Sequence, residues 1–161
     1  MKIVRMLFDK FIQSEHDKRS NNAPYDKLDT RQEYVQKMRS KGYEVFVADD
    51  DELLIDIDGR RLRDLFTERF FHLKQMLWET MQVNIEKWNE FPSHTKGHSH
   101  VIIKFPFPLT TPERLFLQAW LGSDPVKEML SMFRAWKGDM YPSLLCMNPE
   151  IFEQAQRSKD A

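Results

Sequence analysis

Two short polar motifs, each set in an apolar strand, could support chemistry in this chain. Asp56 and Asp58 alternate with Ile55 and Ile57. In a strand, residues two apart share a face, so the two carboxylates stand side by side while the isoleucines enter the core. Like charges held this close repel one another unless a cation lies between them. The pattern therefore predicts a site for Mg²⁺ or Mn²⁺, ions that clamp attacking and leaving oxygens in phosphoryl transfer. The alternative is a solvent-facing polar stripe, although Asp is a poor strand former.

The second motif pairs His98 with His100 at the start of the apolar run 101–103. Three interpretations are open: exposed strand residues, zinc ligands together with a carboxylate, or donors to a nucleotide phosphate. The preceding segment Ser93-His94-Thr95-Lys96-Gly97 favours the last. Hydroxyls, backbone N–H groups and one ammonium suit such a loop to holding phosphate.

Arg60 and Arg61 follow the carboxylates directly and could reach a triphosphate or a template backbone. The alternative is that they belong to the solvated face of an amphipathic helix. Cys146 lies in an apolar run without an activating base nearby, so a nucleophilic role is not expected.

The composition is that of a globular protein rather than a membrane or fibrous one. The chain has 161 residues, enough for one domain with a core, and its formal net charge of -1 gives no general attraction to nucleic acid. A single cysteine excludes an intrachain disulfide and a zinc finger. Without a membrane-length apolar segment or a secretory signal, the expected location is the cytoplasm, with no membrane partner.

The elements that must position these residues follow from periodicity and from helix start and stop signals. A helix is predicted over 3–12, and residues 14–29 read as a polar linker. Thr30 and Glu33 form a capping box for a helix over 31–41. A strand over 43–47 is then predicted to fold back onto the strand 53–58 through an acidic turn, giving a hairpin.

The remaining pattern alternates helices with strands. We expect a helix over 61–83, a loop over 89–97, a strand over 98–105, helices from Thr111 and over 125–137, a strand over 143–146 and a brief last helix. This order predicts an α+β fold whose small antiparallel or mixed sheet is covered by helices, with the polar motifs on the uncovered face. Residues 1–30 would form an N-terminal helix and linker, and 31–161 a single domain.

The order of these motifs resembles that of the archaeo-eukaryotic primase superfamily, particularly the small primase–polymerase-like proteins of phages and plasmids. Residues 54–58 match the first motif of the family, and residues 93–100 look like its second. Residues 114–125 and 142–145 look like segments that follow in phage members, so the resemblance covers about 43–147.

The resemblance implies an RRM-like core and a metal-dependent nucleotidyltransferase active in phage or plasmid DNA replication. Its partners would be a nucleoside triphosphate, a single-stranded DNA template and replication proteins such as a helicase. The implied site roles are metal binding by Asp56 and Asp58, contact of His100 with the nucleotide, phosphate support from Ser93, Lys96 and His98, and template contact by Arg60 and Arg61.

The chain departs from the family in its third motif, a strand-borne acid that completes the metal site. Asp124 is a candidate, but an N-cap role in the turn Gly122–Pro125 explains it fully. Two other functions therefore stay open: a non-catalytic module that binds nucleic acid or a replication complex, and a metal-dependent hydrolase or nuclease that uses all four motif residues.

Overall fold

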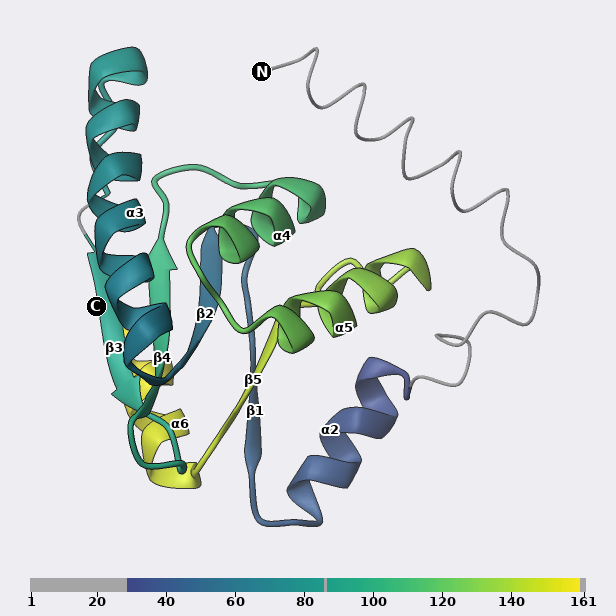
Figure 1. Cartoon of the computed structure of the whole chain (residues 1–161). Helices are drawn as coiled ribbons and strands as arrows, with labels where there is room; N and C mark the ends of the chain where they lie inside the picture. The colour runs from purple at the N-terminus through teal and green to yellow at the C-terminus, as the bar shows by residue number, and fades with distance from the viewer. Residues whose placement is uncertain (1–28, 86, 160–161) are drawn as a thin grey trace.

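The structure, a computed structural model, describes residues 29–85 and 87–159 (Figure 1). The helix predicted over 3–12, and the linker except for its last residue, lie outside the described residues. Along the chain the elements are α2 (Arg31–Arg39), β1 (Glu44–Val47), β2 (Glu52–Asp58), α3 (Gly59–Met81), β3 (Lys87–Pro92), β4 (His98–Lys104), α4 (Thr111–Trp120), α5 (Pro125–Trp136), β5 (Leu144–Met147) and α6 (Pro149–Lys159). The fold is α+β, as predicted, and no described helix has the length and apolarity needed to cross a membrane.

A three-stranded antiparallel sheet in the order β2-β4-β3 carries both polar motifs. One face of this sheet packs against α3, which begins directly after Asp58 (Figure 1). The alternating residues predicted to enter the core do so: the cluster joins strand and helix side chains Leu53, Ile55, Ile57, Phe66, Phe70, Leu73, Val101 and Ile103. Burial of this apolar layer fixes which face of β2 and β4 remains for the polar residues.

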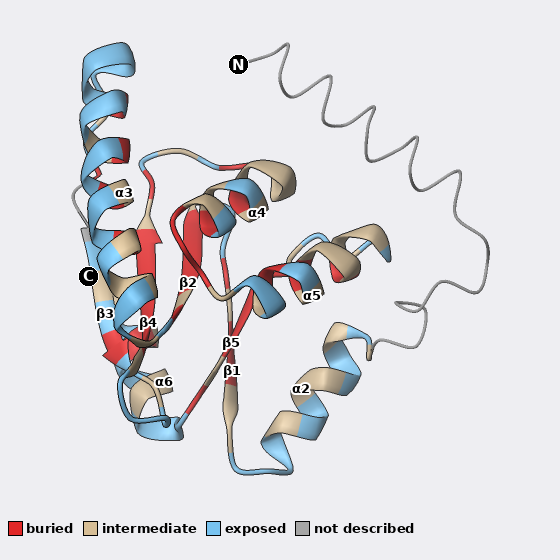
Figure 2. Ribbon diagram, in the orientation of Figure 1, coloured by how far each residue is buried: buried red, intermediate tan, exposed pale blue. Residues whose placement is uncertain are grey.

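The opposite face is not open along its whole length, contrary to the prediction of an uncovered face. Strands β1 and β5 form a separate antiparallel pair that packs there together with α6 (Figures 1 and 2). The second core cluster contains Phe46, Ala48, Leu54, Phe91, Ile102, Leu145, Met147 and Ala155. Only the end of β2 and β4 that carries the aspartates and histidines is left for a pocket.

The predicted hairpin between 43–47 and 53–58 is wrong. β1 pairs with β5, and the backbone bond from Ala48 N–H to the carbonyl of Ser143 extends that pairing. β2 pairs with β4 along one edge, and side chains of α4 and of the turn before α5 occupy its other edge, so neither edge is left for β1. The acidic turn bonds elsewhere as well, because the carbonyls of Asp50 and Asp51 accept from the 105–109 segment.

Other boundaries agree with the sequence more closely. The Thr30–Glu33 capping box is present, and a second capping box at Thr110 and Glu113 begins α4. Residues 89–92, predicted as loop, belong to β3, which pairs with the outer edge of β4. Pro92 ends that strand at the sheet edge, where a missing N–H costs least.

Candidate functional site

The register between β2 and β4 brings the two motifs together. Asp56 lies opposite His100, and Asp58 lies opposite His98. Residues that face each other in an antiparallel pair project from the same side of the sheet. The single site inferred from the sequence required this adjacency, and the structure provides it.

Each aspartate contacts the histidine opposite it. Nδ1 of His98 is 2.6 Å from Oδ1 of Asp58 in a hydrogen bond. Nδ1 of His100 is 3.1 Å from Oδ1 of Asp56, within ion-pair distance but without the alignment of a hydrogen bond. Each carboxylate uses one oxygen in these contacts, so the other is left for a cation.

A pocket of about 310 Å³ lies over these four side chains. We call it the strand pocket, and its lining is Tyr34, Asp56, Asp58, Ser93, His94, Thr95, His98, His100, Lys127, Leu130, Arg134, Leu144, Leu145 and Cys146. The hydroxyl-bearing turn before β4 thus contributes Ser93 and Thr95 to this lining. Carboxylates, imidazoles and hydroxyls converge here, which is the donor set for a metal-bound anion.

Four residues predicted from the sequence do not line the strand pocket: Lys96, Arg60, Arg61 and Asp124. Lys96 is exposed in the same turn as Ser93 but is not part of the lining. Arg60 and Arg61 are exposed at the start of α3, where Arg60 lies 4.0 Å from Asp64 one turn along the helix. Their position allows contact with a nucleic-acid strand outside the pocket rather than with a ligand inside the pocket.

His100 is the most buried polar side chain of the four motif residues, with an exposed fraction of 4%. Neither of its ring nitrogens has a hydrogen-bond partner among the described residues. Buried polar atoms are nearly always paired in native proteins. The ring nitrogens of His100, one of them beside the Asp56 carboxylate, are therefore available for a hydrogen bond to a ligand at the base of the pocket.

Helix α5 forms a cationic wall of the strand pocket, and the sequence alone leaves its basic residues undecided between a solvated helix face and a phosphate contact. Lys127 and Arg134 are seven residues apart, and Leu130 lies between them, so the three share a helix face. In the sequence, this i, i+3, i+7 spacing is the signal that could indicate a pocket-lining helix face, but the same spacing is typical of an ordinary amphipathic helix. Nζ of Lys127 donates to Oε1 of Glu128 at 2.6 Å and to the carbonyl of Leu54 at 2.7 Å.

Tyr34 and Cys146 close another side of the strand pocket. The Tyr34 hydroxyl lies 3.0 Å from Sγ of Cys146, and the guanidinium of Arg134 stacks 4.6 Å from the centre of the Tyr34 ring. Burial raises the pKa of the Cys146 thiol, and burial together with the contact to Cys146 raises the pKa of Tyr34. Both groups are thus neutral near pH 7, in agreement with the expectation that Cys146 is not a nucleophile.

The corner between α4 and α5 replaces a neighbouring strand at the free edge of β2. The Leu54 N–H donates to Oε1 of Gln118, and the Asp56 N–H donates to Oγ of Ser123. The Asp56 carbonyl accepts from the backbone N–H of Asp124 at 2.8 Å. Both backbone polar groups of Asp56 are therefore held, which orients its carboxylate toward the strand pocket.

Asp124 serves as the N-cap of α5. Its Oδ1 accepts from the backbone N–H of Lys127 at 2.7 Å, and it does not line the strand pocket. Within the parts of the chain that the structure describes, no group of three or more His, Cys, Asp or Glu side chains is arranged to hold a metal ion. A cation here would have to complete its coordination with ligand oxygens and water.

Comparison of the chain with models of known protein families, with curated proteins and with solved structures yields no match.

Proposed function

We propose that this chain is a metal-dependent nucleotidyltransferase of primase–polymerase type, which takes a nucleoside triphosphate with Mg²⁺ or Mn²⁺. The observation that carries the proposal is the cross-strand register: Asp56 faces His100 and Asp58 faces His98 in one pocket. Mg²⁺ is typically bound in proteins by one or two carboxylates, with substrate phosphates and water as further ligands. The donor set of the strand pocket fits that mode.

The residues divide by chemistry. When bound, the metal would neutralise phosphate charge and activate the attacking 3′-hydroxyl, which displaces pyrophosphate from the α-phosphorus. Asp56 and Asp58 would hold the metal through their free oxygens, with Asp56 oriented by its anchored backbone. His100 offers a buried nitrogen without a partner among the described residues, and Ser93 offers a hydroxyl. These two groups would donate to phosphate oxygens.

A template strand would run outside the strand pocket. Arg60 and Arg61 are exposed at the first turn of α3, directly after Asp58. Guanidinium groups in that position suit the phosphate backbone of single-stranded DNA. A role in phage or plasmid replication would place the protein in the cytoplasm, beside replication proteins such as a helicase.

The test combines binding and activity. Purified protein is titrated with Mn²⁺ and a nucleoside triphosphate, then assayed for extension of primed and unprimed single strands. Asp58→Asn should abolish extension and weaken Mn²⁺-dependent nucleotide binding. Glu68→Gln, which removes an exposed carboxylate on α3 away from Arg60, is the matched control and should leave both unchanged. Full activity of Asp58→Asn would overturn the proposal.

One observation favours a metal-dependent hydrolase or nuclease as the second candidate. The carboxylate contact on Nδ1 of His98 leaves Nε2 of that ring as a possible metal ligand, the arrangement seen in zinc sites. Metal analysis separates the two functions. Zinc that survives dialysis, together with cleavage of a phosphodiester, would support the hydrolase. Nucleic-acid binding that is unchanged by EDTA, without nucleotide affinity, would instead support a non-catalytic module.

A further inference from the structure

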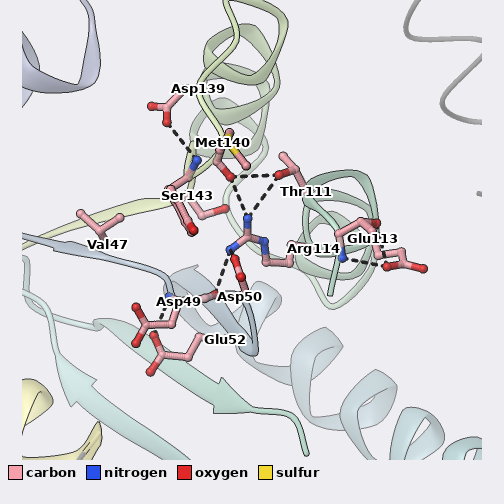
Figure 3. Close-up of polar contacts among 12 residues, drawn as sticks. Val47, Asp49, Asp50, Glu52, Thr111, Glu113, Arg114, Asp139, Met140 and Ser143 are labelled. Carbon is pink, nitrogen blue, oxygen red and sulfur yellow. Dashed lines mark hydrogen bonds and ion pairs between the residues drawn. The ribbon is translucent and has the colours of Figure 1, made fainter. Parts of the chain in front are cut away.

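The chain contains two deeply buried arginines whose surroundings differ. Arg114, with 2% of its surface exposed, donates to the carbonyls of Asp49 and Met140 and to the Thr111 hydroxyl (Figure 3). Oδ1 of Asp50 lies 4.0 Å from its guanidinium. Arg114 is thus a structural residue whose terminal nitrogens tie α4 to the acidic turn and to the segment after α5, although its Nε has no hydrogen-bond partner among the described residues.

Arg134 has no comparable set of partners. It has 6% of its surface exposed, and among the described residues no carboxylate lies within ion-pair distance of it, although the charges of Asp139 and Asp29 act to raise the pKa of its guanidinium. Its Nε, like that of Arg114, lacks a hydrogen-bond partner among the described residues. Its one direct contact of note is the stack on the Tyr34 ring, and burial lowers the pKa of its guanidinium.

A buried cation without an ion-pair partner is expensive, because burial removes its hydration. A guanidinium remains charged in proteins, so deprotonation does not relieve this cost. Lys127, one end of the same helix face, is already neutralised by Glu128. Of these two basic residues on α5, Arg134 is therefore the one without an ion-pair partner among the described residues, and it is available to bind an external anion.

We propose that Arg134 binds a phosphate group of the ligand in the strand pocket, opposite the metal-binding carboxylates. The planar guanidinium is suited to two-pronged contact with phosphate oxygens. Identification of the phosphate as part of a nucleoside triphosphate rests on the proposed function. The ligand would then lie between Asp56 and Asp58 on the strand side and Arg134 on the helix side, with the Tyr34 stack fixing the guanidinium plane.

A second cavity, of about 380 Å³, shares Arg134 with the strand pocket. Its lining includes Arg31, whose guanidinium is 3.4 Å from Oδ1 of Asp139. The second cavity is lined by Asp29 and Asp139 as well as by Arg31 and Lys137, and nothing in it would bridge its carboxylates to a phosphate, whereas Asp56 and Asp58 would be bridged to a phosphate by their cation. The anion is therefore assigned to the strand pocket.

The experiment uses two probes, tripolyphosphate alone and a nucleoside triphosphate with Mn²⁺, on the full chain. Arg134→Met should weaken binding of both by about tenfold to a hundredfold, as expected for loss of a charge-assisted contact. The affinity of Arg134→Lys for both probes should lie between those of Arg134→Met and the wild type, because an ammonium keeps the charge but not the two-pronged donor geometry of the guanidinium. Mn²⁺ affinity measured without nucleotide should stay at the wild-type value. Arg31→Met, which alters only the second cavity, is the matched control.

Unchanged binding of both probes by a folded Arg134→Met protein would overturn the inference. Weakening by Arg31→Met as large as that by Arg134→Met would place the anion in the second cavity and overturn it as well. Failure of the proposed function gives a different result: tripolyphosphate binds and depends on Arg134, while the nucleotide with Mn²⁺ binds no better than tripolyphosphate and supports no extension. Thermal unfolding of every variant without ligand checks that the fold is retained.

Discussion

Asp56 lies directly across the β2–β4 ladder from His100, with 3.1 Å between Oδ1 of the carboxylate and Nδ1 of the imidazole. The aspartate is anchored on its other side, where its backbone N–H donates to Ser123. The histidine side chain has no such anchor, since both ring nitrogens lack hydrogen-bond partners among the described residues. The pair therefore combines a fixed carboxylate with an unsatisfied imidazole.

The substitution His100→Leu should weaken ligand binding while leaving the stability of the fold nearly unchanged. Because the imidazole is buried without a hydrogen-bond partner, an apolar side chain should change the free energy of unfolding by less than about 1 kcal/mol. The affinity for a nucleoside triphosphate with Mn²⁺ should fall, because a phosphate donor is lost. Urea denaturation and calorimetric titration measure the two effects. His72→Leu, an exposed change on α3, should alter neither. A large loss of stability in His100→Leu with intact binding would assign His100 to the core instead.

The free edge of β2 should be a sensitive point for stability. Gln118 is fully buried, accepts from the Leu54 N–H and donates to Glu128 and Ser143. Gln118→Leu leaves several buried groups unpaired and should lower the free energy of unfolding by about 3 kcal/mol. Gln75→Leu, on the exposed side of α3, should stay within about 0.5 kcal/mol of the wild type in the same urea titration. Equal stability of the two variants would show that water replaces the Gln118 contacts.

Substitutions of Asp124 test whether this residue acts as an N-cap or as a metal ligand. Its side chain accepts from the Lys127 N–H at the start of α5, so Asp124→Ala should cost about 1 kcal/mol of stability. Asp124→Ser keeps a capping oxygen without a carboxylate and should restore most of that loss. Both variants should bind Mn²⁺ as the wild type does, as measured by calorimetry. Loss of Mn²⁺ binding by a stable Asp124→Ser protein would make Asp124 the third acid after all.

The thiol of Cys146 should make stability depend on pH. Burial raises its pKa above the value of about 8.5 found in unfolded chains. Between these two values the folded state holds a proton that the unfolded state releases, so stability falls as pH rises through this range. Below about pH 7.5 the contribution is complete. Urea titrations near pH 7 and pH 9.5 should show a larger loss for the wild type than for Cys146→Ala. Parallel losses in both proteins would show that the thiol titrates normally in the fold.

Local signals in the sequence predict most of the elements but not their pairing. The capping boxes at Thr30 and Thr110 depend on residues three apart, so the pattern of each can be recognised in the order of the residues. The partner of β1 is separated from it by about 100 residues, and proximity along the chain wrongly favours a hairpin with β2. What excludes that hairpin is the occupation of the second edge of β2 by Gln118 and Ser123, a tertiary contact without a sequence period.

The candidate site is predictable to a similar extent. Strand alternation places Asp56 beside Asp58 and His98 beside His100, and the register then joins the two pairs. Alternation cannot reveal burial, so the unsatisfied state of His100 emerges only from packing. The cations of α5 stay undecided in the sequence for another reason: a Lys and an Arg seven residues apart are typical of a solvated helix face as well as of a pocket wall.

The contrast between the two buried arginines gives a final prediction. Arg114→Met removes two hydrogen bonds that join α4 to the acidic turn and to Met140 and a third to Thr111 within α4, and should cost about 3 kcal/mol of stability (Figure 3). Arg134→Met removes a buried charge without an ion-pair partner among the described residues, so its free energy of unfolding should equal or exceed that of the wild type. Urea titration of both variants without ligand measures this difference.

Addition of tripolyphosphate should then stabilise the wild type and Arg134→Lys but not Arg134→Met, because a ligand raises stability only in proportion to its occupancy of the folded state. A destabilised Arg134→Met that still gains stability from tripolyphosphate would make Arg134 a structural residue of the same kind as Arg114.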